Sequence, residues 1–248
     1  MFRSFMLGFL ASATALGLSP IAASAGSFSI SPLRVEFSPR TQTGALTLRN
    51  QEETPVVVQA EAVLWQQVDG EDQLSPTRDV LVSPAVFTLP GNGSQLIRVA
   101  LRRPADQQQQ LSYRLILTEV PQQANPMFTG LNMALRLSLP VFVAPTAPAE
   151  PRIEWSAVRG ADGAIALTAR NTGNAHARVL SYNVAPAASS APGIQQDVTA
   201  YILPGQARTW TLDNRQDEAT SSNDWHRLRV QGTTEAGDFA VEIRSEGP

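Results

Sequence analysis

Apolar side chains occupy every second position in the segment from Leu131 to Val143. The large ones fall on one side of an extended chain, with small or polar residues between them: Leu131, Met133, Leu135, Leu137 and Leu139. Because alternate side chains of a strand point to opposite faces, this pattern predicts a β-strand with one apolar face. That face either packs inside a sandwich of the same chain or inserts into another chain. Strands prefer Val, Ile and Thr to Leu and Met, which keeps the second interpretation open.

The same alternation recurs along the chain between turns rich in Pro, Gly and Asn, and no amphipathic helix of ordinary length is predicted. Further strands are predicted at Phe28–Phe37, Ala45–Asn50, Pro55–Trp65, Val82–Leu89, Gln95–Arg102 and Leu111–Val120. Pro32 interrupts the first of these, so we expect an edge strand or a switch between sheets there. Pro90–Gly93 predicts a tight turn. Short strands at this spacing favour an all-β sandwich or barrel.

The second half of the chain repeats motifs of the first. The sequence Leu-Thr-Leu-Arg-Asn at 46–50 resembles Leu-Thr-Ala-Arg-Asn at 167–171, and Leu-Pro-Gly recurs at 89–91 and 203–205. The two separations are similar, which predicts two sandwiches of one general plan. The runs Arg227–Val230 and Phe239–Ile243 are expected to close the second sandwich as a hairpin.

Two segments set the predicted domain boundaries. Residues 1–25 read as a signal peptide, with Arg3, a short apolar run over Met6–Leu18 and the small-residue site Ala23-Ser24-Ala25. The apolar run is too short for a membrane anchor, so we expect an exported protein, periplasmic in a Gram-negative cell. Thr146–Pro151 predicts a short Pro-rich linker. The expected domains are therefore 26–145 and 146–248.

Composition excludes several classes of function. The net charge is −3, which predicts neither a nucleic-acid partner nor membrane insertion. There is no Cys, and His176 and His226 have no partners at metal-ligand spacing, so we expect no metal, no cofactor and solvated histidines. We find no phosphate-binding loop, nucleophile elbow or zinc motif, and we predict that the protein is not an enzyme.

Several short motifs, in their order and spacing, resemble the periplasmic chaperones of the chaperone–usher pathway, which assemble pili. They are Pro32–Val35 near the expected mature start, Leu89–Gly91 before an alternating strand, Tyr113–Leu115 and Glu119–Pro121 before a loop, and the apolar alternation that ends at Pro145. The resemblance covers nearly all of the expected mature chain. It implies two immunoglobulin-like β-sandwich domains joined by the Pro-rich linker.

The resemblance also implies a function. Subunits of this pathway are incomplete immunoglobulin-like sandwiches, and the chaperone fills the gap with a strand of its own before an outer-membrane usher receives the subunit. The residues implied for this role form what we call the donor row: Leu131, Met133, Leu135, Leu137 and Leu139. The expected partners are pilus or fimbrial subunits and an usher. An apolar edge could also pair with a second copy of the chain.

The family anchors the C-terminal carboxylate of the subunit between two basic residues. Arg34 matches the first, whereas the second, a Lys in the better-known branch, falls at Pro140. All 19 basic residues of this chain are Arg. This departure is similar to a divergent branch called archaic or alternative. Arg114 on the neighbouring strand is our preferred substitute, and Arg136 is the second, because a guanidinium can hold a carboxylate through two hydrogen bonds.

The alternative hypothesis is an exported two-domain adhesin that binds carbohydrate or protein. Such a module would carry an aromatic platform on one face. The Trp residues are instead spread over both halves, at 65, 155, 210 and 225, and we expect most of them in cores. A third candidate, a structural pilin, disagrees with two complete sandwiches.

Overall fold

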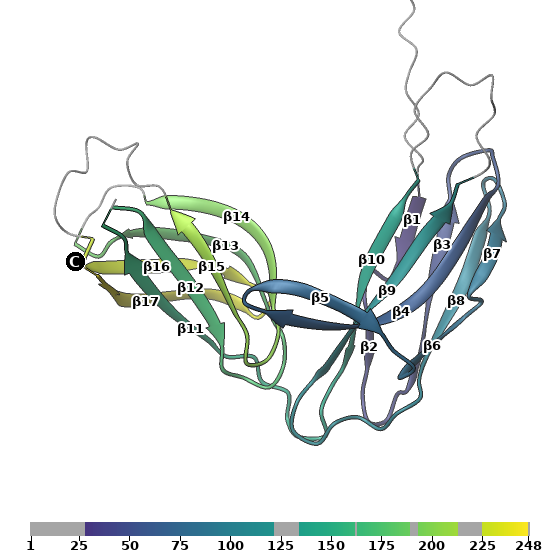
Figure 1. The fold of residues 1–248 in the computed structure, drawn as a ribbon, viewed down its shortest axis with the longest axis horizontal. Coiled ribbons are helices and arrows are strands. Elements are labelled where there is room, and N and C mark those ends of the chain that lie inside the picture. The colour runs from purple at the N-terminus through teal and green to yellow at the C-terminus, as the bar shows by residue number, and fades with distance from the viewer. Residues whose placement is uncertain (1–27, 122–133, 162, 189–192, 213–224, 248) are drawn as a thin grey trace, which may run out of the picture.

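The computed structural model describes residues 28–121, 134–161, 163–188, 193–212 and 225–247. Within these ranges the chain forms strands, turns and bends, and no helix long and apolar enough to cross a membrane is found. The predicted all-β class is therefore confirmed. Figure 1 shows two sandwiches set at an angle to each other.

The first sandwich consists of two sheets. One has the order β1 (Phe28–Ser31), β3 (Thr43–Asn50), β8 (Ser94–Leu101) and β6 (Val80–Ser83). The other has the order β2 (Val35–Phe37), β10 (Arg136–Val143), β9 (Leu111–Val120), β4 (Val56–Val68) and β5 (Glu71–Pro76), with β7 (Val86–Leu89) paired to β4. Alternation drives this packing, because inward residues such as Leu46, Ile97 and Leu115 are almost fully buried between the sheets.

Two predicted strands of this half are divided between the sheets. Pro32 separates β1 from β2, which lie in different sheets and at the edge of each, so the edge position and the switch between sheets are both observed. The run Val82–Leu89 is not one strand, which corrects our prediction. It is interrupted at Pro84, which follows β6, and the chain then enters the other sheet as β7. Proline breaks a hydrogen-bonded ladder, so the division has a local cause.

In the described part of the second sandwich, seven strands follow one continuous order. They are β14 (Ile194–Ile202), β13 (Ala177–Pro186), β16 (Arg227–Thr234), β17 (Gly237–Glu246), β11 (Ile153–Arg159), β12 (Ile165–Asn171) and β15 (Ala207–Leu212). β16 and β17 pair in antiparallel register as far as Thr234 and Gly237, which confirms the predicted hairpin. Gly237 has φ 126°, a conformation that side-chain-bearing residues rarely adopt.

The repeated motif marks equivalent positions in the two sandwiches. Asn50 and Asn171 are both fully buried. In each, the Nδ2 group donates to the carbonyl four residues later. The Nδ2 group of Asn50 also donates to the Pro90 carbonyl of the Leu-Pro-Gly motif, and that of Asn171 to the carbonyl of Ile202, directly before the motif. Each Oδ1 atom accepts the backbone N–H two residues later. Both amides thus hold the same turn in place, and the prediction of one general plan is confirmed.

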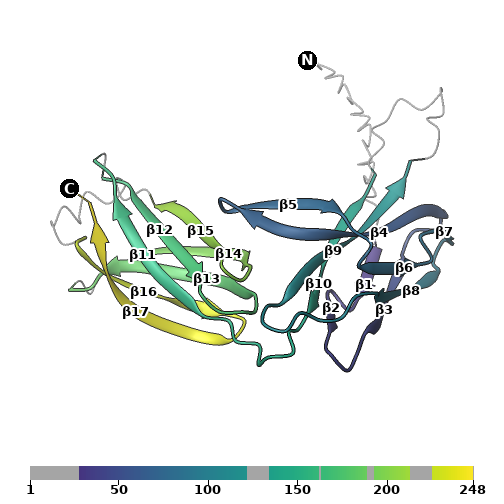
Figure 2. The same cartoon turned by 60° about the horizontal axis from the view of Figure 1, so that its bottom comes forward.

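The segment between the sandwiches is tied to both. The N–H groups of Thr146 and Ala147 donate to the loop that precedes β9, at 2.9 Å and 3.0 Å. Asn174 of the second sandwich donates its N–H to the Glu150 carbonyl at 3.0 Å. The hairpin of β4 and β5 also reaches from the first sandwich towards the second (Figures 1 and 2), where Arg208 donates to the Gly70 carbonyl at 3.1 Å.

Candidate functional site

The free edge of β10 is the first element of the site. β10 pairs with β9 over its whole length, but with β2 only from Val141 to Val143. The stretch Arg136–Pro140 therefore has no strand partner on its second side among the described residues. An unpaired edge presents backbone N–H and C=O groups to any strand that is added to it. The open flank that the donor hypothesis requires is present in the structure.

The structure divides the donor row. Leu131 and Met133 lie outside the described residues. Leu135 and Leu137 are half-buried, and Leu137 packs against the core of the first sandwich. Leu139 is 4% exposed and belongs to that core. The side chain of Leu139 thus fills the chain's own sandwich and has little exposed surface in the free protein.

Two of the predicted anchor residues lie in one row across the sheet. Pro140 is directly opposite Arg114, and Val35 is opposite Val141, so Arg34 comes beside Pro140 one residue earlier. With strands about 4.8 Å apart, the Cα atoms of Arg34 and Arg114 are separated by roughly 10 Å. Arg136 lies further along β10, about 13 Å from Pro140, and it is exposed. The structure brings together Arg34 and Arg114 but not Arg136.

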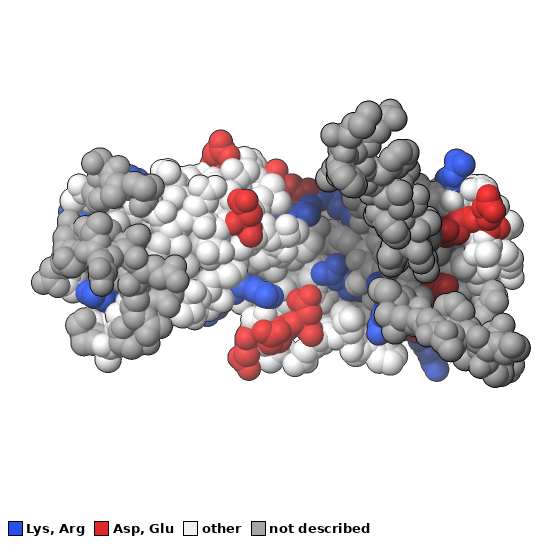
Figure 3. Space-filling model, turned by 90° about the horizontal axis from the view of Figure 1, so that it is seen from above, with Lys and Arg blue, Asp and Glu red and all other residues white. Residues whose placement is uncertain are grey.

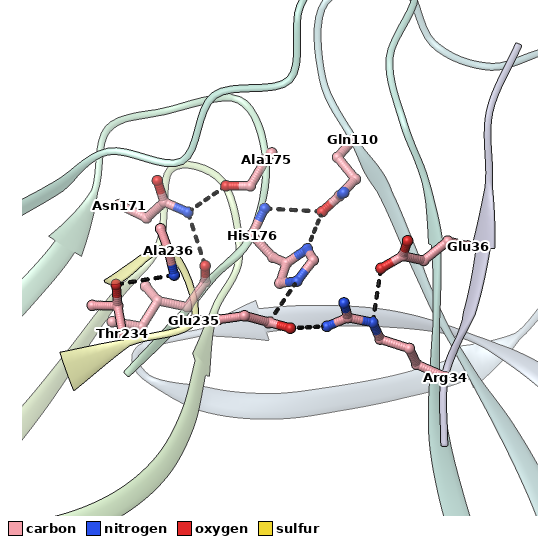
Figure 4. A network of polar contacts seen from close by, with 10 residues as sticks. Arg34, Glu36, Gln110, Asn171, Ala175, His176, Thr234, Glu235 and Ala236 are labelled. Atoms are coloured by element: carbon pink, nitrogen blue, oxygen red, sulfur yellow. Dashed lines mark hydrogen bonds and ion pairs between the residues drawn. The ribbon is translucent and has the colours of Figure 1, made fainter. Parts of the chain in front are cut away.

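Arg34 is held by carboxylates from both sandwiches (Figure 4). Its Nε is 2.7 Å from Glu36 of β2, and its Nη1 pairs with Glu235, which lies in the turn between β16 and β17. Partial burial favours the neutral form, but the hydrogen bond to Glu235 and the charge of Glu36 outweigh it and raise the pKa of Arg34. The guanidinium is therefore charged and already paired.

Arg114 lies deeper in the site. Its guanidinium carbon is 3.6 Å from the centroid of the Trp65 ring, and its Nη2 is 3.8 Å from Asp72. Only 14% of the side chain is exposed. Burial lowers the pKa of Arg114, and the charge of Asp72 offsets part of this effect. Seen from above, basic side chains line the hollow between the sandwiches with acidic ones beside them (Figure 3).

An aromatic cluster joins the two sandwiches beneath these arginines. Trp65 and Phe142 of the first sandwich pack with Tyr201 and Leu203 of the second. Gln67 fixes the joint, since its Nε2 donates to the Tyr201 carbonyl at 3.0 Å and its Oε1 accepts the N–H of Leu203 at 2.9 Å. Trp65 is thus buried between the sandwiches.

The other Trp residues give no exposed aromatic platform. Trp225 is 6% exposed and lies in the core of the second sandwich. Trp155 and Trp210 are half-buried and pack against each other and against that core. The adhesin hypothesis therefore finds no support in the Trp residues.

His176 lies at the joint with only 13% of its side chain exposed, which sequence reasoning missed. Its ring stacks on Phe142 with centroids 3.6 Å apart, and its Nδ1 donates to Gln110 at 2.8 Å. Its Nε2 is 3.9 Å from Glu235 (Figure 4). Burial lowers the pKa of His176 to about 4, so the ring is neutral at neutral pH. The prediction of a solvated histidine was wrong here, whereas His226 is exposed as expected.

The chemistry of these groups is that of binding. Among the described residues no group of three or more His, Asp and Glu side chains could hold a metal ion. The arginines can hold a carboxylate, and the free edge can accept a strand. Together they have the geometry that binding of an extended chain with a free carboxylate requires.

Solved structures share the fold of this chain. The chaperone–tip adhesin complex of archaic Csu pili from Acinetobacter baumannii matches with a TM-score of 0.66 at 20% identity, covering 89% of this chain and 100% of the matched one. The complex of SafA pilin with the SafB chaperone from Salmonella enterica gives 0.61 at 18% identity, covering 90% and 98%. These matches confirm the two immunoglobulin-like sandwiches.

Curated relatives are similar over a shorter region. The probable fimbrial chaperone EcpB of Escherichia coli O157:H7 is 26% identical over 144 residues, which is 56% of this chain and 59% of the relative. The protein of the same name from Klebsiella pneumoniae is 27% identical over 145 residues, 56% and 60% of the two chains. The chain thus matches less than two thirds of the length of these relatives. Residues 27–149 match the model of the N-terminal domain of pili and flagellar-assembly chaperones, PapD type, and through this domain the chain belongs to that family.

Proposed function

We propose that this protein is a periplasmic chaperone that stabilises pilus subunits by donor-strand complementation and passes them to an outer-membrane usher. The observation that carries the proposal is the free edge of β10 from Arg136 to Pro140, with Arg34 at its closed end. Residues 1–25 are proposed as the signal peptide that directs export, and residues 26–145 and 146–248 as the two domains. The protein acts by binding, not by catalysis.

The pairing of β10 with β2 determines the direction in which a strand can be added. β2 occupies the edge of β10 from Val141 onwards, so a strand that is added along Arg136–Pro140 has to end or turn at that point. Arg34 directly precedes β2. A strand parallel to β10 that terminates there brings its C-terminal carboxylate to Arg34. An antiparallel strand would bring an amino group, which the guanidinium repels.

The donor side chains are those that precede the buried end of β10. Leu135 and the half-buried Leu137 belong to the described part of the row, and we propose that Leu131 and Met133 continue it. Each apolar side chain that enters the groove of an incomplete subunit would contribute on the order of 1.5–3 kcal/mol. The same insertion removes bare core and an unpaired edge from solvent, which prevents aggregation of the subunit.

The proposed anchor is Arg34, with Arg114 as its partner across Pro140. Both guanidinium groups are paired in the free protein, Arg34 with Glu235 and Glu36 and Arg114 with Asp72. An incoming carboxylate therefore exchanges with an internal one at Arg34. Arg136, exposed and further along the strand, is proposed only as a weaker contact to the subunit.

The test is co-expression with pilus subunits encoded beside the gene, followed by co-purification from periplasmic extracts. Arg34→Ala should cost roughly 2–5 kcal/mol of subunit binding, because a desolvated carboxylate loses its partner. Arg49→Ala, an exposed arginine on the opposite sheet, is the matched control and should change nothing. Leu135→Glu should release the subunit and leave the chaperone soluble, whereas Leu96→Glu on the outer face of β8 should not. Unchanged co-purification of both site variants contradicts the proposal.

A further inference from the structure

The first and last strands of the second sandwich separate along part of their length. β11 and β17 pair in parallel only at Ala157 with Ser245 and Val158 with Glu246. Val241 of β17 lies opposite the fully buried Val230 and shares its core-facing side, yet it is 37% exposed. The core of the second sandwich is therefore open along this seam.

A pocket of about 470 Å³ occupies the opening. Its apolar walls include Ile153 and Trp155 of β11 and Phe239 and Val241 of β17. The rings of Trp155 and Phe239 stack with centroids 5.1 Å apart. The volume falls within the range of roughly 300–1,000 Å³ that is typical of ligand sites.

Arg34 links this pocket to the proposed anchor. The polar residues that line the pocket include Arg34, Glu235 and His176, the group that joins the two sandwiches in Figure 4. A carboxylate held by Arg34 therefore lies at the pocket, and the side chain attached to it can enter. The end of the added strand is fixed by β2, so the residue that arrives here is the last one of the bound chain.

We infer that the pocket between β11 and β17 receives an apolar side chain at the C-terminus of the bound subunit. The inference rests on the proposed function and names what the partner must carry, namely a free C-terminal carboxylate on a residue with a large apolar side chain. The aromatic and aliphatic walls give a polar side chain no hydrogen-bond partners, and the charged groups of the lining, Arg34 and Glu235, are already paired with each other. The pocket is thus a specificity site beside the anchor.

The charges at the pocket mouth make the side chain important for affinity. Arg34 already pairs with Glu235 and Glu36, so a subunit carboxylate that replaces Glu235 exchanges one ion pair for another. The exchange alone gives little net gain. Burial of an apolar side chain provides the net free energy of binding that the exchange of ion pairs does not. The carboxylate and the side chain are therefore required together.

The experiment uses the full exported chain and synthetic ten-residue strand-forming peptides of alternating Val and Thr. The peptides differ only in the last residue, Phe, Ser or Asp, and each is made as free acid and as amide. We expect the Phe acid to bind at least tenfold more tightly than the Ser acid, and at least fivefold more tightly than the Phe amide, by calorimetry. Equal affinities for the Phe and Ser acids would overturn the inference.

Variants that fill the pocket sharpen the test. Val241→Trp should abolish the preference for Phe over Ser and keep the preference for acid over amide. Val158→Trp, half exposed on β11 and absent from the pocket lining, is the matched control. If Val241→Trp does not fold by circular dichroism, Ala236→Trp in the turn at the pocket provides the same obstruction. A retained Phe preference in the folded filled variant would also overturn the inference.

The two proposals fail in distinguishable ways. Arg34→Ala should remove the acid preference. If the wild-type chain prefers acids but not apolar last residues, only the pocket assignment is wrong. If it has no acid preference and Arg34→Ala changes nothing, the anchor itself is wrong. If a second copy of the chain occupies the pocket, light scattering will show a dimer that Val241→Trp dissociates and the Phe acid does not, which excludes a subunit terminus as occupant.

Discussion

The two sandwiches close in the same way and to different effect. In each, the last strand pairs in parallel with an early strand only near its own end, with β2 for β10 and with β11 for β17. In the first sandwich the inner side chain of the unpaired stretch, Leu139, is covered by core. In the second, Val241 stays exposed. One incomplete closure thus leaves a backbone edge and the other leaves an apolar pocket.

This difference separates the shared scaffold from the proposed binding features. Asn50 and Asn171 hold equivalent turns by equivalent hydrogen bonds, so the plan of both sandwiches is maintained away from their last strands. The two sandwiches differ in the side chains that fill the space beside the last strand, where its parallel pairing stops. Variation at the closing strands can therefore create a binding surface without disturbing the fold.

The largest expected effect tests the shared plan. Asn50→Ala and Asn171→Ala should each lower the free energy of unfolding by about 3–6 kcal/mol, because buried carbonyl and N–H groups lose their partners. Urea denaturation of each variant measures the loss. Similar losses support equivalence of the two turns, and a loss below about 1 kcal/mol in one of them would break the comparison.

The second effect tests the division of the donor row. Leu139→Ala should lower the free energy of unfolding by about 2–5 kcal/mol, since it leaves a cavity in the first core. Leu135→Ala should change it by less than about 1 kcal/mol, because that side chain is only half-buried. Denaturant midpoints of the two variants provide the measurement. Equal losses would place both residues in the core and shorten the proposed donor row.

The third effect concerns the joint between the sandwiches. His176 has a folded-state pKa of about 4, below its value of roughly 6.5 in an unfolded chain. Between these two pH values the unfolded state binds more protons than the folded state. The contribution of neutral His176 to the free energy of unfolding is therefore complete above about pH 6.5 and is lost as the pH falls towards 4. The free energy of unfolding lost in this way is up to about 3 kcal/mol. Burial is the main cause, with Glu235 opposing it and Arg34 and Arg178 adding to it.

His176→Phe provides the control for this pH dependence. The Phe ring can stack on Phe142 but cannot take up a proton. Thermal melts at pH 7, 5.5 and 4 should show a shallower loss of stability in the variant than in the wild-type chain. Parallel pH profiles of the two proteins would contradict the assignment to His176.

The smallest effect concerns the charge that the second sandwich contributes to the anchor of the first. Glu235→Gln removes the carboxylate that pairs with Arg34, so the affinity for a peptide with a free C-terminal carboxylate should rise about two- to fivefold. The gain should vanish in the Arg34→Ala background. A gain of the same size for the amide peptide would argue against direct competition at Arg34.

Much of the fold could be predicted because alternation and turn residues are local signals. Strands such as β8 and β9, the hairpin of β16 and β17, and the shared position of Asn50 and Asn171 follow from patterns within a few residues. The division of Val82–Leu89 could have been found from Pro84, which breaks a ladder.

The parts of the site that sequence reasoning missed depend on distant contacts. Alternation places Leu139 on an apolar face but does not tell which core that face meets. The ring of His176 is covered by Phe142 of the other sandwich, and Glu235 reaches Arg34 across 201 residues of chain. No local pattern marks such pairs, since the angle between the sandwiches decides them.

The side chain of Gln67 has a mechanical consequence. Its amide group donates to one peptide group and accepts from another on the segment Tyr201–Leu203, much as a neighbouring backbone would. The joint between the sandwiches therefore resists opening, because rotation of one sandwich against the other would break both hydrogen bonds at once. We therefore expect an incoming chain to adapt its own conformation, while the angle between the two sandwiches stays fixed.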